Sequence, residues 1–494
     1  MQSLGFGGGF IMNVYIKREN KSYTIDAREV APLTASQDMF LNKTKTASMV
    51  GPLAIAVPGE VMGYWEAHQR FGSMTWKEII EPSIKVCQDG IILSKHMWDA
   101  LHTNPLVKND THLSSTFVNQ TTGEFYRVGT RVYPQKELCE TYRKIMINGG
   151  MDFYNGTIAK MIVEDLREIG SIITAEDLES YNVNWHYSTH VPLNTDTLHV
   201  VPPVGSGTIL AFILNVLRGY NMTQKNLESP KEAALTYHRF IEAYKFAFVK
   251  RYELGDIRFN NVTDLLNKLT SSEYAEGIRK LIDDTKTFND TDHYQMKFLS
   301  KTQTGTSHIS ILAPNGDAVA VTSSVNFYFG CGHTGRRTGI IFNSGMDDFS
   351  SPGINNFFGI PGAEPNYIRP QKRAMSSMCP TIVTDKTGDV KLVIGAAGGT
   401  KILSSVAWVI ARSLWFGEDI KQAIDAPRIH HQLLPNEVQY EYGVLQSIVD
   451  GLAARGHKLV RYQERGSTMC GIAKNETAVY ANADYRKKGD VSGL

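Results

Sequence analysis

The first 300 residues mix helical and strand-like patterns of apolar positions. In residues 230–252 apolar side chains recur at the spacing of one helix face, and we expect the aromatic residues there to pack in a core rather than to line a ligand site. Thr174–Asp177, directly before Leu178, has the spacing of a capping box, in which the first and fourth side chains bond each other's backbone amides. These patterns predict a long buried helix and, earlier in the chain, a helix that begins directly after Thr174.

Polar, turn-forming residues interrupt this pattern near residue 300. The segments Asp283–Lys286 and Asn289–Asp292 are predicted to be exposed. The small polar stretch Lys301–Gly305 then runs directly into strand-like sequence. Thr306 is therefore predicted to lie at the start of a strand, immediately after a loop.

A β-hairpin is predicted after this loop. Its strands are the β-rich runs His308–Leu312 and Val319–Thr322, and the residues between them, Pro314–Asp317, favour a short turn. Thr306 would then precede the first strand of the hairpin.

A strand, a glycine pair and a helix follow one another later in the chain. Val390–Gly395 is a short apolar run, Gly398 and Gly399 come next, and residues 402–414 have apolar positions at helical spacing. Partial positive charge collects at a helix N-terminus, so two bare amides at this point can hold an oxyanion. The same glycine pair is also compatible with an ordinary tight turn.

The composition is that of an ordinary globular protein. The chain has 494 residues, of which 42% are hydrophobic and 20% charged, and this composition excludes the disordered, collagen and coiled-coil classes. Its formal net charge of +1 gives no electrostatic footprint for nucleic acid, whereas small neutral or zwitterionic substrates remain compatible. No run approaches the roughly 20 apolar residues of a membrane helix; the best candidate, Ile209–Leu217, is broken by Asn215.

Two features bear on the compartment in which the protein works. The density of N-x-Ser/Thr sequons predicts a glycosylated, extracytoplasmic surface, although an Asn- and Thr-rich chain can also produce them by coincidence. The five cysteines are odd in number and widely spaced, so they form no metal-ligand pattern and allow at most two disulfides. The sequons begin at Asn20, Asn42, Asn109, Asn119, Asn155, Asn221, Asn261, Asn289 and Asn475.

Candidate chemistry centres on Thr306. A threonine hydroxyl is a poor nucleophile at neutral pH and needs an adjacent base. If the peptide bond between Gly305 and Thr306 were cut, the new α-amino group of Thr306 would be that base. Gly305 gives the bond little steric protection, and strain can concentrate at a junction between a loop and a strand. By itself, a Gly-Thr pair at a strand start is unremarkable.

The surrounding sequence resembles γ-glutamyltransferases of the eukaryotic type over essentially the whole chain. Residues Gly305–Ser310 look like the site at which these proenzymes are processed, with the threonine opening the small subunit. Further motifs occur in the order of the family. They are Asp26–Pro32, Ala56–Glu60, Thr322–Gly330, Met346–Pro352, Met375–Thr381, Gly395–Thr400, Ala426–Arg428 and Gln432–Asn436.

The resemblance implies an α+β fold, the four-layer αββα sandwich of the N-terminal-nucleophile hydrolases. Residues 1–305 would form the large subunit and residues 306–494 the small catalytic subunit. The two subunits would stay associated as a heterodimer and together build one αββα unit, with Thr306 at its centre.

The resemblance also assigns catalytic roles. Thr306 would be the nucleophile, and the backbone amides of Gly398 and Gly399 would stabilise the oxyanion. Ser324, at a position where relatives often carry threonine, would contact Thr306 and support its orientation and the self-cleavage. The exchange keeps the hydroxyl, so we expect little loss.

Substrate-binding roles follow from the same motifs. Arg28, with the hydroxyls of Ser376 and Ser377, would bind the α-carboxylate of the γ-glutamyl group, and Asp348, helped by Asn326, would bind its α-ammonium. The residues alone permit plainer readings. Arg28 could form a surface salt bridge with Glu29, Asp347 and Asp348 could cap a turn, and the two serines could be ordinary loop residues.

Two positions depart from the family pattern. Gly345 stands where relatives usually carry a Glu or Gln that helps to bind the substrate's amino group. Losing one hydrogen bond to a charged group costs on the order of 1.5–3 kcal/mol, which would weaken glutamyl binding or change specificity. Met1 falls inside a region that relatives precede with a signal or membrane anchor. We therefore expect an N-terminally truncated chain whose full-length form is secreted or lies on the extracellular face of the plasma membrane.

The function implied is that of a γ-glutamyltransferase and glutathione hydrolase. Thr306 would take the γ-glutamyl group from glutathione, its S-conjugates or other γ-glutamyl amides and pass it to water, an amino acid or a dipeptide. Neither a metal nor an organic cofactor nor a nucleic acid is implied. Two rivals stay open: a related acylase, such as a cephalosporin-type enzyme, and an uncleaved, inactive paralogue, which Gly345 and the expected truncation would suit.

Overall fold

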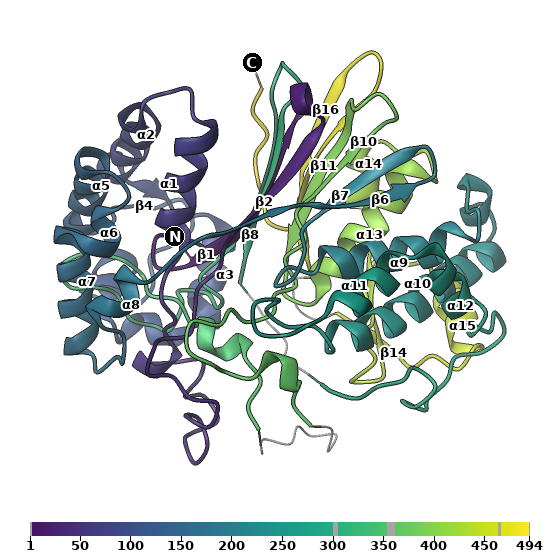
Figure 1. The fold of residues 1–494 in the computed structure, drawn as a ribbon, viewed down its shortest axis with the longest axis horizontal. Coiled ribbons are helices and arrows are strands. Elements are labelled where there is room, and N and C mark those ends of the chain that lie inside the picture. The colour runs from purple at the N-terminus through teal and green to yellow at the C-terminus, as the bar shows by residue number, and fades with distance from the viewer. Residues whose placement is uncertain (1, 300–304, 353–360, 463–465, 494) are drawn as a thin grey trace.

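Two antiparallel β-sheets lie face to face between two groups of helices (Figure 1). The computed structural model describes residues 2–299, 305–352, 361–462 and 466–493. The first sheet has the order β5 (Asn184–Tyr187), β2 (Lys21–Ala27), β1 (Gly9–Ile16), β9 (Ala318–Ser324) and β8 (Ser307–Leu312). The second has the order β16 (Val479–Ala483), β15 (Thr468–Lys474), β11 (Val390–Ala397), β10 (Thr381–Thr384), β7 (Asp196–Val200) and β6 (Thr189–Leu193).

Both sheets combine strands from before and after residue 305. In the first sheet β1, which precedes residue 305, is hydrogen-bonded to β9, which follows it, with Gly9 opposite Ser324. In the second sheet β7 pairs with β10 in the same way, with Val200 opposite Thr381. The parts of the chain on either side of residue 305 therefore share one set of sheets and do not form separate domains.

Helices cover the outer faces of the sheets on two sides (Figure 1). One group is formed by α1 (Glu60–Phe71), α2 (Trp76–Asp89), α5 (Lys136–Asn148), α6 (Asp152–Asn155), α7 (Thr157–Glu168) and α8 (Ala175–Glu179). The other group contains α9 (Gly207–Arg218), α10 (Pro230–Arg251), α11 (Thr263–Thr270), α12 (Ser272–Arg279), α13 (Lys401–Leu414), α14 (Ile420–Asp425) and α15 (Gln446–Ala453). The remaining α-helices and β-strands of the described residues are α3 (Lys95–Thr103), α4 (Thr111–Phe117), β3 (Ile91–Ile92), β4 (Arg131–Val132), β12 (Ile429–His430), β13 (Val438–Tyr440) and β14 (Leu459–Arg461).

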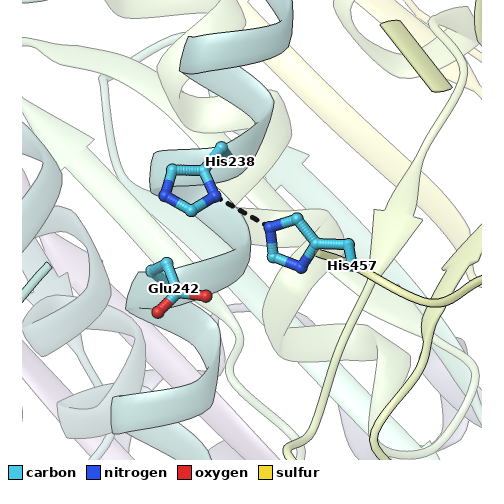
Figure 2. Close-up of side chains that lie close together, drawn as sticks. All are labelled: His238, Glu242 and His457. Atoms are coloured by element: carbon cyan, nitrogen blue, oxygen red, sulfur yellow. Dashed lines mark hydrogen bonds between the residues drawn. The ribbon is translucent and has the colours of Figure 1, made fainter. Parts of the chain in front are cut away.

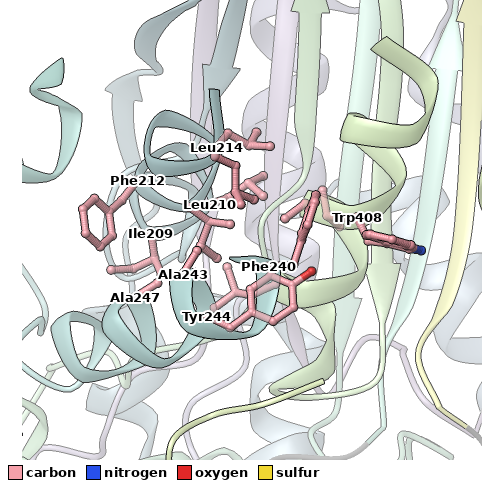
Figure 3. Packing of buried hydrophobic residues seen from close by; sticks show 14 of the residues in the cluster. Ile209, Leu210, Phe212, Leu214, Phe240, Ala243, Tyr244, Ala247 and Trp408 are labelled. Carbon is pink, nitrogen blue, oxygen red and sulfur yellow. The ribbon is translucent and has the colours of Figure 1, made fainter. Parts of the chain in front are cut away.

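The largest hydrophobic core lies among α9, α10 and α13 (Figure 3). Every residue of α9 from Gly207 to Leu217 is buried, which explains its uninterrupted apolar sequence. The Trp408 ring of α13 packs against Tyr237 and Phe240 of α10, with ring centroids 4.7 and 4.8 Å apart. The aromatic residues of α10 thus belong to the core, as predicted. Among the described residues, no helix combines the length and the apolarity needed to span a bilayer.

Most of the predicted local structure is confirmed. The capping box at Thr174 opens α8, the hairpin forms as β8 and β9, and the apolar run 390–395 becomes β11, which leads into α13. The prediction of exposure for Asp283–Lys286 was only partly correct, because Asp284 accepts two hydrogen bonds from the Arg239 guanidinium and is half-buried. The predicted loop residues 301–304 lie outside the described part of the chain.

One disulfide is present, between Cys87 of α2 and Cys139 of α5. It joins two neighbouring helices of the first group across 52 residues of sequence. Cys331, Cys379 and Cys470 are free thiols. The outcome lies within the limit of two disulfides that the cysteine count set.

The two sheets pack closely at His308, the second residue of β8. His308 is buried there, and its Nδ1 lies 2.9 Å from Thr322 Oγ1 of the neighbouring strand. The ring lies against Gly395 of β11 so closely that a Cβ added to this glycine would be 2.2 Å from His308 Cε1. A side chain at residue 395 would therefore push the sheets apart at His308, two residues after Thr306.

We expect Gly395→Ala to lower the free energy of unfolding by about 1–3 kcal/mol, because the added methyl group overpacks the space that the His308 ring fills. Thermal unfolding followed by circular dichroism measures this change. Gly277→Ala is the control, since an added Cβ there meets nothing within 4 Å in α12. It should be neutral or stabilise by up to about 1 kcal/mol. Equal effects of the two substitutions would contradict the packing argument.

Candidate active site

Thr306 lies directly before β8, where the predicted strand begins, and faces a cavity of about 920 Å³. It is 9% exposed. The cavity wall also contains Gly398, Tyr328 and Lys401, so the segments that follow β9 and β11 contribute to it. A volume of this size is typical of sites for small molecules.

The carbonyl of the peptide bond between Gly305 and Thr306 accepts a hydrogen bond from a side chain. Ser324 Oγ donates a hydrogen bond to the Gly305 carbonyl oxygen at 2.5 Å and accepts one from the Asn326 backbone N–H at 2.8 Å. The Asn326 amide therefore fixes the Ser324 hydroxyl, whose proton polarises the carbonyl carbon that a nucleophile would attack. The family resemblance predicted a contact of Ser324 with Thr306; its hydroxyl bonds the carbonyl of the preceding residue, Gly305, and its role in cleavage stays a prediction.

Gly305 has a backbone conformation that favours glycine. Its φ is +100°, and a Cβ at this residue would lie 2.5 Å from the Asn326 carbonyl oxygen. A side chain at residue 305 would therefore clash with the segment that carries Ser324. A glycine at residue 305 is thus needed for the backbone there to approach Asn326 so closely.

Gly398 and Gly399 connect β11 to α13 in left-handed conformations, with φ values of +129° and +61°. Their carbonyls accept hydrogen bonds from the Lys401 and Ile402 amides of the first helical turn. The amides of Gly398 and Gly399 themselves precede this turn, at the helix N-terminus where partial positive charge collects. Gly398 lines the cavity that Thr306 faces, so this helix N-terminus can stabilise negative charge that develops next to the threonine.

A buried cluster of charges lies deeper in the molecule. Arg28 Nη2 is 2.5 Å from Asp348 Oδ2, and its Nη1 is 3.3 Å from Glu29 Oε2. The side chains of all three residues are at most 3% exposed. Arg28 therefore does pair with Glu29, but in the interior rather than in a surface salt bridge.

Ser376 and Ser377 are tied to this cluster through two connecting residues. Asn366 Nδ2 donates to the Asp348 carbonyl, and its Oδ1 accepts from the Met375 amide just before Ser376. Arg373 Nε donates to the Arg28 carbonyl at 3.2 Å. These bonds link the backbone just before the serine pair to the backbone of Asp348 and Arg28, whereas Ser376 Oγ itself accepts a hydrogen bond from the Met378 amide.

The cluster contains polar atoms that the described residues leave without a hydrogen bond. They are Arg28 Nε, both carboxylate oxygens of Glu29, Asp348 Oδ1 and Ser377 Oγ. Glu29 Oε2 is close to Arg28 Nη1, but the hydrogen-bonding capacity of these buried atoms is not used by the described residues. Buried polar atoms in native structures nearly always have a hydrogen-bond partner, so this concentration points to a ligand. Donors for a carboxylate and acceptors for an ammonium group occur here together.

Burial sets the charge balance of the cluster. It raises the pKa of the Asp348 carboxyl to about 7, while Arg28 opposes this shift and Glu29 and Asp347 add to it. Burial likewise raises the pKa of the Glu29 carboxyl, again opposed by Arg28. One guanidinium thus faces two carboxylates, and a cation such as an α-ammonium group would relieve the surplus of negative charge.

Gly345 begins the short 3₁₀ helix Gly345–Asp348, directly beside Glu29. A Cβ added to this glycine would lie 3.0 Å from Asn343 Oδ1 and 3.5 Å from Glu29 Cβ. Gly345 has no side chain that could reach the cluster, but the Glu29 carboxylate lies in it. From the sequence, Glu29 was assigned only as a possible salt-bridge partner of Arg28, and its position relative to Gly345 was missed.

The predicted residues therefore form two groups. Thr306 and Gly398 line the open cavity, whereas Arg28, Asp348, Ser376 and Ser377 are buried and do not line it. Asn326 connects the groups, because its backbone holds Ser324 while its Nδ2 donates to the Ser344 carbonyl, next to the 3₁₀ helix that carries Asp348.

His238, Glu242 and His457 are the described residues whose donor atoms come close enough to suggest a metal centre (Figure 2). However, His238 Nδ1 and His457 Nε2 share a hydrogen bond at 2.8 Å. Glu242 accepts a hydrogen bond from Tyr294 at 2.7 Å and pairs with Lys245 at 3.1 Å. A cation between the imidazoles would have to break these contacts, so the cluster is best described as a buried hydrogen-bond network.

The chain is similar to known proteins over its whole length. The family profile described as "Gamma-glutamyltranspeptidase" matches residues 1–494. The chain is 41% identical to "Scoloptoxin SSD14" of Scolopendra dehaani, over 100% of this chain and 85% of the relative. It is 36% identical to "Glutathione hydrolase 3" of Arabidopsis thaliana, over 92% of this chain and 72% of the relative.

Among solved structures, the cephalosporin acylase of Bacillus halodurans superposes with a TM-score of 0.82 at 22% identity, over 99% of this chain and 88% of the acylase. At this identity the likeness concerns the fold alone. It shows the fold of the N-terminal-nucleophile hydrolases, as the sequence resemblance implied.

Proposed function

Since the chain belongs to the γ-glutamyltranspeptidase family, we propose that it is a self-cleaving γ-glutamyltransferase and glutathione hydrolase. The observation that carries the proposal is the junction at Thr306, where the Ser324 hydroxyl bonds the Gly305 carbonyl at 2.5 Å beside the open cavity. In this reading Thr306 Oγ attacks that carbonyl, and the C–N bond between Gly305 and Thr306 breaks to leave an ester and a free α-amine on Thr306. Water then hydrolyses the ester, which gives residues 1–305 and 306–494 as separate chains. The shared sheets would keep the two products together as a heterodimer.

The cleaved enzyme would then act by covalent catalysis. The Thr306 hydroxyl attacks the γ-carbonyl of the donor, and its proton passes to the α-amino group of the same residue. The amides of Gly398 and Gly399 stabilise the oxyanion, the C–N bond breaks, and the leaving amine takes up the proton. Water or the amine of an amino acid or dipeptide then attacks the ester and regenerates the hydroxyl.

The buried charge cluster would hold the amino-acid head of the donor. Arg28, with Ser377 and Ser376, would bind the α-carboxylate, because a guanidinium and hydroxyls are the donors such a group requires. Asp348 would bind the α-ammonium, supported by Asn326. The unpaired acceptors of Glu29 lead us to add this residue as a second carboxylate for the ammonium, which would offset the side chain missing at Gly345.

The two rivals differ in their chemistry. An acylase of the cephalosporin type shares the fold, but an acyl group without a free amino-acid head would leave buried polar atoms such as Arg28 Nε and Asp348 Oδ1 without a hydrogen bond, which is costly. An inactive paralogue would need neither the Ser324–Gly305 hydrogen bond nor the unpaired polar atoms around Asp348. Both observations therefore favour a γ-glutamyl enzyme.

The proposed cleavage gives a direct prediction. The wild-type chain should yield two bands on a denaturing gel, and the smaller should begin with Thr306-Ser307-His308 on N-terminal sequencing. Thr306→Ala should remain intact because it lacks the nucleophile. Ser324→Ala should cleave more slowly, by about tenfold for one lost hydrogen bond to the carbonyl, while Ser324→Thr keeps the hydroxyl and should cleave normally. A wild-type protein that stays intact would rule out the proposed function.

Asp348→Asn should raise KM for a γ-glutamyl donor by about tenfold to a hundredfold, because a charged hydrogen bond to the α-ammonium is lost. Glu29→Gln should raise it by a smaller factor. Since the Asp348 pKa is raised to about 7, protonation below that pH should also raise the wild-type KM as the solution becomes more acidic. Initial rates on cleaved protein measure both effects, with Asp264→Asn on α11 as the control. An unchanged KM in Asp348→Asn would contradict the assignment of the cluster to the donor's head.

We also propose that the protein is glycosylated and works outside the cytoplasm, secreted or anchored at the extracellular face of the membrane. The sequon asparagines support this, because Asn119 is half-buried and the other eight are exposed. The disulfide Cys87–Cys139 fits an oxidising compartment. Peptide-N-glycosidase treatment of protein from a eukaryotic secretory host should increase its mobility on a gel, and Asn119→Gln should change the mobility less than Asn289→Gln. No shift on treatment would contradict glycosylation.

A further inference from the structure

Lys487 contacts the carbonyl of Thr306, whereas Ser324 contacts the carbonyl of Gly305. The residue follows β16 and is half-buried, and its Nζ donates hydrogen bonds to the Thr306 carbonyl oxygen at 3.1 Å and to Ser307 Oγ at 2.6 Å. It also lines the cavity that Thr306 faces. The motifs that carried the family resemblance did not include this part of the chain.

The turn that presents Lys487 is fixed by a buried carboxylate. Asp484 is 1% exposed, and its Oδ2 accepts hydrogen bonds from the Met469 amide and from Arg428 Nη2. The Asp484 carbonyl in turn accepts from the Lys487 amide at 3.1 Å. The lysine is therefore presented by a turn that is anchored to β15, rather than by a loose C-terminal tail.

Lys401 also lines the cavity, and His308 and His430 lie near Thr306. Burial lowers the pKa of His430 to about 3, and burial together with the charge of Lys487 lowers that of His308 to about 3, so both imidazoles are neutral near pH 7. Asp99 on α3 forms an ion pair with Lys95, and the Lys401 ammonium lies 4.1 Å from the Tyr462 ring centroid. The titratable groups that line the cavity within the described residues are His96, Asp99, Tyr328, Lys401, His430 and Lys487.

We infer that Lys487 is a positioning residue that holds Thr306 by its carbonyl and keeps the α-amine exposed by cleavage in its neutral, proton-accepting form. The inference rests on the proposed function of Thr306. An ordinary α-amino group has a pKa of about 7.7–8.0 and is mostly protonated at pH 7. The Lys487 ammonium bonds the carbonyl of the same residue that carries the amine. A cation so close to the amine disfavours its protonated form and lowers its pKa.

The amine of Thr306 must be neutral because it accepts a proton during catalysis. When Thr306 Oγ attacks the donor, its proton must move to the amine nitrogen, and a protonated amine has no lone pair to accept it. Removing the Lys487 charge should raise the pKa of this amine, so a larger share of the enzyme would be inactive at neutral and acidic pH. At alkaline pH the amine is neutral in either case and the difference should vanish.

The test compares Lys487→Arg, which keeps charge and donors, with Lys487→Gln, which keeps a donor, and Lys487→Met, which keeps neither. Lys488→Met is the matched control, because Lys488 is the exposed neighbour in the same turn. The pH dependence of kcat at saturating γ-glutamyl anilide reports groups in the substrate complex, which separates this effect from donor binding by Asp348. Cleavage on a gel and thermal unfolding accompany each assay.

We expect the acid limb of kcat to move to higher pH by about one unit in Lys487→Met and Lys487→Gln, so that kcat falls by about tenfold at pH 6 and hardly at pH 9. Lys487→Arg and Lys488→Met should keep the wild-type limb. Cleaved Lys487→Met with an unshifted limb, whether or not its KM changes, would overturn the inference while leaving the proposed function intact. A wild-type chain that does not cleave would overturn both.

Discussion

The close packing of two sheets, each built from strands on both sides of residue 305, is the constraint on which the rest of the structure depends. It allows β8 to begin at the site of proposed cleavage while β1 and β9 remain hydrogen-bonded beside it. Gly395 and His308 set the separation of the sheets at this point. A cut before Thr306 would therefore free one amine and leave the packed core, including the Trp408 cluster, in place.

The same architecture separates two physical environments within one site. The cavity at Thr306 is open and can admit a leaving group or an acceptor, whereas Arg28, Glu29 and Asp348 are buried where charge interactions are strong and unpaired charge is costly. A substrate with both a carboxylate and an ammonium group would satisfy that cluster at one end and reach the threonine at the other. Selectivity for a free amino-acid head would then come from burial, and reactivity from the junction of strand and loop.

Much of the local structure could be predicted from the sequence because it depends on neighbouring residues. The capping box at Thr174, the hairpin of β8 and β9 and the glycine pair before α13 each depend on a few adjacent residues and formed as predicted. The apolar run of α9 was too short for a membrane span and proved to be a helix buried on all sides. Exposure was harder to predict, as Asp284 shows, since its partner Arg239 is 45 residues away.

The sequence by itself determined the family, the order of the elements and the identity of the residues proposed to react, because motifs and periodicity depend on residues that lie close together in the sequence. Only the tertiary structure decided which charges meet. Arg28 and Asp348 are 320 residues apart and Lys487 and Thr306 are 181 apart, so no spacing rule relates either pair. The proximity of Glu29 to Gly345 likewise follows from how the chain packs in three dimensions. Burial, which moves the pKa of Asp348 to about 7, is a property of the fold and not of the residue.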